Sequence, residues 1–164
     1  MDEVAILAAL GAYLVVVLII LAVCYVLASL SHMKALKAMG YDKAWMAWIP
    51  FAQWYACADA ATAGRQDDVK LFGSVSVPVS LYKFWWVLWL ILQVVSQFFL
   101  GSILGLLSTV VQVIFLGNTY VKMYAALDGT DEKDQQVIGY ISGFLSIIAV
   151  FKFLFGSYNT KVRK

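Results

Sequence analysis

The longest uncharged stretch of this chain runs from Phe84 to Val121. As a single α-helix it would measure ~57 Å, because each helical residue adds ~1.5 Å. The hydrocarbon core of a bilayer is only ~30 Å thick. The stretch is too long for one membrane crossing and long enough for two, so we expect it to fold back near Gly101 and Ser102. This pattern predicts an integral membrane protein.

The composition agrees with a membrane protein. Hydrophobic residues make up 63% of the 164 residues and charged residues 13%, against roughly 25% charged in soluble domains. This length suits one helical membrane domain over residues 1–164. A net charge of +2 is too small to predict nucleic-acid binding. Cys24 and Cys57 form no C-x-x-C pair, and we expect two buried thiols rather than a disulfide.

A second uncharged stretch, Val4 to Leu30, follows an acidic N-terminus and precedes His32 and Lys34. It lacks the basic region that begins a cleavable signal peptide and exceeds a signal core in length, so we expect it to remain as a membrane helix. The positive-inside rule then predicts that the N-terminus lies outside and that residues 31–43 face the cytoplasm.

The predicted fold is an all-α membrane bundle with four transmembrane helices and one Trp-rich interfacial helix. The expected spans cover about residues 4–30, 82–99, 103–124 and 136–157. Residues 44–61 are the interfacial helix, because Trp and Tyr prefer the headgroup boundary; a fifth short span is the alternative. The expected interfacial anchors are Trp45, Trp48, Trp54, Trp85 and Trp86. The alternation from Ser74 to Pro78 is interpreted as an extended lead into a helix, since a lone strand has no partner.

Counting basic residues favours four spans over five. Four spans leave eight basic residues inside, namely Lys34, Lys37, Lys43, Arg65, Lys70, Lys83, Lys122 and Lys133. The four outside are then Lys152, Lys161, Arg163 and Lys164. Five spans give seven inside and five outside. The four-span topology leaves a basic C-terminal tail outside, which is its least favourable feature.

Four polar residues in apolar segments form a candidate intramembrane patch, namely Asp59, Gln93, Gln97 and Gln112. Ionisable groups inside a membrane often mark proton or ion sites. Asp59 lies close to a polar stretch, however, and we favour a place in the headgroup zone. The glutamines are expected to hydrogen-bond between neighbouring helices rather than to line a pore.

Small residues at helical spacing mark candidate helix contacts. Gly101 and Gly105 form one small-xxx-small pair, and Gly139 and Gly143 form another. These pairs suit packing within the chain or contact with another subunit, and the pattern does not separate the two. A patch of alanines in the first span, Ala5, Ala8, Ala9 and Ala12, likewise allows another helix to approach closely.

No pattern in the sequence indicates an enzyme. His32 is the single histidine and has no cysteine or carboxylate cluster beside it. The chain carries no H-E-x-x-H, no G-x-S-x-G and no phosphate-binding glycine loop. We therefore expect no catalytic residues, no metal site and no cofactor.

Residues 36–59 resemble a family of small multi-pass membrane proteins of Gram-positive bacteria. The resemblance rests on the basic, Gly-ended segment Leu36–Tyr41 and on the Ala-Trp-x-Ala-Trp-Ile-Pro-Phe segment at 44–51, followed by the Trp-led span at Trp85. Members usually carry Asn where this chain has Gln53. The family is uncharacterised, so the resemblance implies a bacterial plasma membrane and no particular chemistry.

The preferred function is a non-enzymatic subunit or scaffold that binds other membrane proteins. Short loops, small-residue helix faces and the absence of an active-site pattern support it. The expected partners are the lipid bilayer and either another membrane protein or a second copy of the chain. A small homo-oligomeric channel or transporter is the alternative, and a membrane-protecting immunity or stress protein is a third possibility.

Overall fold

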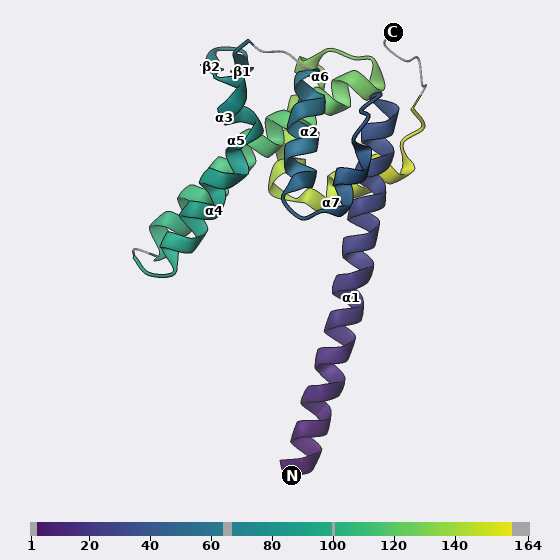
Figure 1. Ribbon diagram of the computed structural model, residues 1–164, viewed down its shortest axis with the longest axis vertical. Coiled ribbons are helices and arrows are strands. Elements are labelled where there is room, and N and C mark those ends of the chain that lie inside the picture. Colours follow the sequence, from purple (N-terminus) through teal and green to yellow (C-terminus); the bar gives the residue numbers. More distant parts are fainter. Residues whose placement is uncertain (1–2, 64–66, 100, 159–164) are drawn as a thin grey trace.

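Two apolar arms project from a helical head in the computed structural model, which describes residues 3–63, 67–99 and 101–158 (Figure 1). The first arm, the α1 arm, is the N-terminal part of α1 (Glu3–Ala38). The second, the hairpin arm, combines α4 (Trp85–Ser96) with the first half of α5 (Gly101–Asp128). The last turns of α1 and the second half of α5 belong to the head. Its other elements are η1 (Ala44–Trp48), α2 (Ala52–Thr62), β1 (Val69–Leu71), β2 (Val75–Val77), α3 (Val79–Lys83), α6 (Glu132–Phe144) and α7 (Ser146–Phe155).

The predicted all-α class is confirmed, apart from one small antiparallel ribbon. β1 pairs with β2, and Val69 lies opposite Val77. The interpretation of residues 74–78 as a lead without a strand partner is therefore wrong. The partner is the segment just upstream, which a tight turn brings back through the positive φ angles of Phe72 (52°) and Gly73 (76°).

Two helices in the described residues, α1 and α5, are long and apolar enough to cross a membrane. They contain the predicted spans 4–30 and 103–124. The four-span bundle is not confirmed, because a crossing needs about 20 helical residues. The predicted span 82–99 contains a break at Phe84 and a helix of only 12 residues, α4. The predicted span 136–157 is broken at Leu145 into α6, of 13 residues, and α7, of 10 residues.

The predicted interfacial helix at 44–61 is two helices rather than one. η1 ends at Trp48, and α2 begins at Ala52. Pro50 lacks the N–H that helix continuation needs, and Phe51 adopts a positive φ of 65°. The break lets η1 pack against the end of α1 while α2 packs against α5.

The end of α1 and the end of α7 are joined directly. Lys34 Nζ donates hydrogen bonds to the carbonyl oxygens of Leu154 (2.7 Å) and Gly156 (2.9 Å). The four-span topology put these two segments on opposite sides of the membrane, so that part of the prediction is wrong. Arg65, Lys161, Arg163 and Lys164, which the same topology assigned to loops, lie outside the described residues.

The core of the head forms where α5 and α6 approach closely at glycine residues. A Cβ atom on Gly143 would lie 2.6 Å from the Cα atom of Gly117, and one on Gly139 would lie 2.8 Å from the backbone nitrogen of Val121. Only glycine fits at such distances. The large side chains of Tyr82 and Phe153 in the head, and of Trp85 at the start of the hairpin arm, are fully buried.

Candidate functional site

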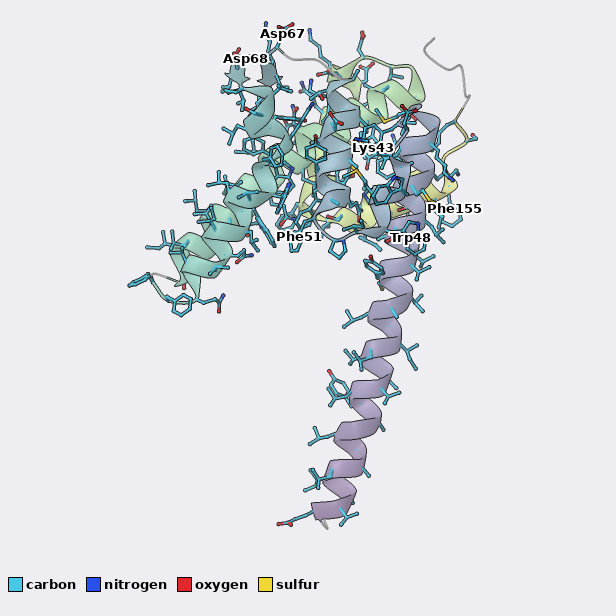
Figure 2. The ribbon with its side chains drawn as sticks, viewed as in Figure 1. Lys43, Trp48, Phe51, Asp67, Asp68 and Phe155 are labelled. Atoms are coloured by element: carbon cyan, nitrogen blue, oxygen red, sulfur yellow. The ribbon has the colours of Figure 1, made fainter. Side chains whose placement is uncertain are left out.

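The head has an apolar base on the side from which α1 projects. Figure 2 shows Trp48, Phe51 and Phe155 there, whereas Asp67 and Asp68 lie at the opposite end. α7 runs along the base, and its exposed side chains Ile147, Phe151 and Phe155 recur every four residues on one helix face. The base consists of these three residues with Trp48, Ile49 and Phe51. Apolar helix faces with aromatic side chains are typical of membrane surfaces.

A polar groove of about 870 Å³ opens between the ends of α1, α2 and α5. Tyr41, Asp42, Lys43, Asp59 and Thr130 supply its polar atoms, and small residues such as Gly40 and Ala126 line the rest. A neighbouring groove of about 510 Å³ is also lined by the end of α2, and it extends to Asp68. Asp68 lies at the end of the head opposite the base (Figure 2). The head is therefore polar at one end and apolar at the other.

Asp59 lies in the first groove and is already paired. Its Oδ1 is 2.6 Å from Lys83 Nζ, and its Oδ2 accepts a hydrogen bond of 2.8 Å from the Tyr41 hydroxyl. Burial and the bond to the Asp59 carboxylate raise the pKa of Tyr41, so the phenol stays a neutral donor at physiological pH. The ion pair joins α2 to α3. Asp59 thus has a structural role that the pattern of the sequence did not reveal.

The three glutamines of the predicted patch do not bond to one another in the described structure. Gln112 Nε2 donates to the carbonyl oxygen of Gly143 at 3.3 Å and links α5 to α6. Gln97 Nε2 reaches the Ser96 hydroxyl at 3.5 Å, and Gln93 is half-buried on α4. Asp59 lies in the head, away from the hairpin arm. The four residues therefore occupy separate places rather than one patch.

The buried polar contacts of the head come instead from residues that the sequence analysis did not select. The Tyr82 hydroxyl donates to Asn118 Oδ1 (3.0 Å) and accepts from the Thr119 hydroxyl (3.0 Å). His32 Nε2 lies 3.0 Å from the Tyr120 hydroxyl, and Tyr124 donates to the Ser142 hydroxyl at 2.8 Å. One feature of the sequence could have indicated these contacts: polar residues cluster at 118–120, at the end of the otherwise apolar stretch.

The two glycine pairs differ in their surroundings. Gly139 and Gly143 are buried in the α5–α6 contact, so this pair serves packing within the chain. A Cβ atom on Gly105 would meet nothing within 4 Å. A Cβ atom on Gly101 would lie 3.1 Å from the carbonyl oxygen of Ser96 and would have no other neighbour within 4 Å. In the described part of the chain, no atom from outside the hairpin arm lies within 4 Å of the Cβ position at either glycine of this pair.

The predicted Trp anchors also fall into two groups. Trp45 (58% exposed) and Trp48 (37% exposed) lie at the surface of η1. Trp85 is fully buried, and Trp54 and Trp86 are half-buried. Trp54 packs its ring 5.5 Å from that of Trp85, and Phe51 stacks on Trp86 at 5.6 Å. These rings fasten the hairpin arm to the head, so Trp85 is not an interfacial anchor.

The described residues bring no three His, Cys, Asp or Glu side chains together in a metal-binding geometry. Comparisons with known protein families, with curated proteins and with solved structures found no match. Conclusions about function therefore depend on the geometry of the head, its base and the two arms.

Proposed function

We propose that the chain is a non-enzymatic membrane subunit that binds another membrane protein through the α1 arm. The observation that carries this proposal is the isolation of that arm. None of the most apolar 18-residue window of α1 is buried against the rest of the chain. From Val4 to Leu27 the arm measures ~36 Å, which suits a slightly tilted membrane crossing.

The distribution of charge supports one orientation of this anchor. Every lysine in the described residues follows the α1 arm, and these are Lys34, Lys37, Lys43, Lys70, Lys83, Lys122, Lys133 and Lys152. Glu3 marks the other end of the arm. The positive-inside rule then assigns the head to the cytoplasmic side of a bacterial plasma membrane and the N-terminus to the outside. The apolar base would lie at the cytoplasmic headgroups.

The faces of α1 indicate where a partner would bind. With 3.6 residues per turn, Ala5, Ala8, Ala9 and Ala12 share one face, here called the alanine face. The opposite face, here called the leucine face, carries Leu7, Leu10, Leu14, Leu18 and Leu21. The residues of α1 that are buried in the head, such as His32 and Ala35, lie on the same side of the helix as the leucine face. The alanine face thus points away from the head. A partner helix could pack closely there without meeting this chain's own head.

Site-specific photocrosslinking in cells tests this proposal. A photoreactive residue is placed in turn at Ala5, Ala8 and Ala12, and at Leu7 and Leu14 as matched controls on the opposite face. We expect adducts with a second, different membrane protein from the alanine face alone, and loss of these adducts in Ala8→Leu. Adducts from both faces equally, or none from either, would contradict the proposal.

The same experiment distinguishes the proposed subunit from the alternative function, a small homo-oligomeric channel or transporter. Crosslinks at twice the mass of the chain would indicate a homo-oligomer, and ion or solute flux in liposomes would then be the next measurement. The pairing of Asp59 with Lys83 and Tyr41 argues against an ion site at that residue.

A further inference from the structure

The hairpin arm exposes an apolar surface that nothing in the described chain covers. The exposed side chains on this surface are Leu88, Ile91, Val94, Val95, Phe98, Phe99, Ile103, Leu106, Leu107 and Val110. Phe98 and Phe99, at the tip, are 75% and 69% exposed. No charged residue occurs between Phe84 and Val121. Such a surface requires apolar surroundings.

The arm is too short to cross a bilayer. α4 has 12 residues and measures ~18 Å. On the return path, the exposed positions in the first half of α5 lie between Gly101 and Val110, a length of ~15 Å, and the helix is buried in the head from Phe115. The hydrocarbon core is ~30 Å thick. Figure 1 also shows that the arm is inclined to α1 and that its tip lies much nearer the head than the N-terminal end of α1 does.

Both ends of the arm are held in the head by ion pairs. Lys83, just before the arm, pairs with Asp59, and Lys122, beyond its return, pairs with Glu132 at 2.9 Å. The chain therefore enters and leaves the arm on the same side of the base. No charged group has to pass through lipid in this arrangement.

Three hydroxyl groups of the arm are satisfied within it, which insertion into lipid favours, whereas the indole nitrogens of Trp85, Trp86 and Trp89, at its entry, are buried without a hydrogen-bond partner in the described structure. The Ser96 hydroxyl donates to the carbonyl oxygen of Gln93 (2.7 Å), and those of Ser108 and Thr109 donate to that of Gly105 (2.8 and 3.0 Å). At the tip, the backbone nitrogens of Phe98 and Phe99 both donate to the carbonyl oxygen of Val95.

We propose that the hairpin arm inserts into only the leaflet next to the head, so that its partner is the acyl chains of that leaflet and α1 is the only helix in the described residues that crosses the membrane. This inference rests on the membrane placement of α1 proposed above. It deepens that proposal by giving the second arm a lipid partner rather than a protein one.

Single cysteines in the full chain test the insertion depth. In a Cys24→Ser, Cys57→Ala background, cysteine replaces Ser102 at the tip, Leu14 in the middle of the α1 arm, Glu3 at its end, or Asp67 on the head. The protein is reconstituted in vesicles of bacterial-type phospholipids, and a charged maleimide is added to one side at a time. We expect Glu3→Cys and Asp67→Cys to react from opposite sides, and Ser102→Cys and Leu14→Cys to react from neither.

A nitroxide attached to the same cysteines gives the depth of each position from its relaxation by oxygen and by a water-soluble nickel complex. We expect the label at Ser102 to lie between the head-side surface and the label at Leu14. Reaction of Ser102→Cys from the side of Glu3 would show a complete crossing, and reaction from the side of Asp67 would show a tip in water. Either result overturns the inference. If Leu14→Cys also reacts with the charged reagent, the membrane placement of α1 fails with it.

Discussion

The head and the two arms all contain many apolar residues, yet they use them in opposite ways. In the head, Tyr82, Tyr120 and Phe153 are fully buried, and the hydroxyls of both tyrosines are hydrogen-bonded. In the arms, side chains such as Leu14 (58% exposed) and Phe98 (75% exposed) face outward. The head is therefore specified by contacts within the chain, whereas the arms depend on their surroundings.

This difference separates two roles of hydrophobicity. Burial of apolar area stabilises the head by about 25 cal/mol per Å² removed from water. The exposed apolar side chains of the arms gain no such energy from the described chain and gain it only when lipid or a partner covers them. Substitutions in the head should change folding stability, and substitutions of similar size in the arms should leave it nearly unchanged.

The largest effect is expected for Gly143→Leu. The added side chain would meet the backbone of Gly117, which cannot move without separating α5 from α6. Overpacking a core costs about 1–3 kcal/mol and sometimes more, and here we expect loss of the folded head. Thermal unfolding in mild detergent, followed by protease resistance, measures it. Gly105→Leu on the hairpin arm is the matched control, and an equal loss there would break the distinction between head and arm.

A smaller loss is expected for Tyr82→Phe. Removal of the hydroxyl leaves Asn118 Oδ1 without its donor inside the head, and a buried unsatisfied group costs about 1–3 kcal/mol. The control is Tyr13→Phe, because Tyr13 is 66% exposed on the α1 arm. Urea unfolding of the head, monitored by tryptophan fluorescence, gives both values. A destabilisation by Tyr13→Phe as large as that by Tyr82→Phe would mean that the arm packs against protein.

Asp59→Asn should destabilise the head by about 1 kcal/mol or less. The Asp59 and Lys83 side chains are 23% and 18% exposed, so solvent screens part of their attraction. Asn can still accept the hydrogen bond from Tyr41, which limits the loss. The effect should shrink in high salt, whereas that of Tyr82→Phe should not. A salt-independent loss would assign the role of Asp59 to hydrogen bonding alone.

Sequence patterns predicted the helical class, both long apolar helices and the fold-back near Gly101, because apolar length and charge are local properties. They predicted four spans, whereas two of the described helices are long and apolar enough to cross a membrane, because shorter apolar helices such as α7 serve equally well at an apolar base. The break at Leu145 carries neither glycine nor proline, so no residue at that position signals it in the sequence. The partner of Asp59 was equally hidden, since Lys83 lies far away in the sequence and only the fold brings the two together.

The smallest effect compares arm and head through the two native cysteines. Measuring their labelling needs no substitution, so it leaves the stability of the protein unchanged and reports only how well each thiol is protected from a reagent in water. Cys57 is buried in the head, where burial raises the pKa of its thiol to about 12, so its reactive thiolate is nearly absent at neutral pH. Cys24 is exposed on the α1 arm. In membranes we expect a charged maleimide to modify neither residue.

Graded urea should then separate the two thiols. Unfolding of the head exposes Cys57, and its labelling should follow the fluorescence transition. Cys24 should remain unmodified through that transition, because urea does not remove α1 from the bilayer, and should react only after the lipid is dissolved in SDS. Mass spectrometry of the two peptides measures both rates in one sample. Labelling of Cys24 in intact membranes before any urea is added would show that water reaches this part of the arm. Only the head would then be protected, by its fold, and the proposed protection of the α1 arm by lipid would be wrong.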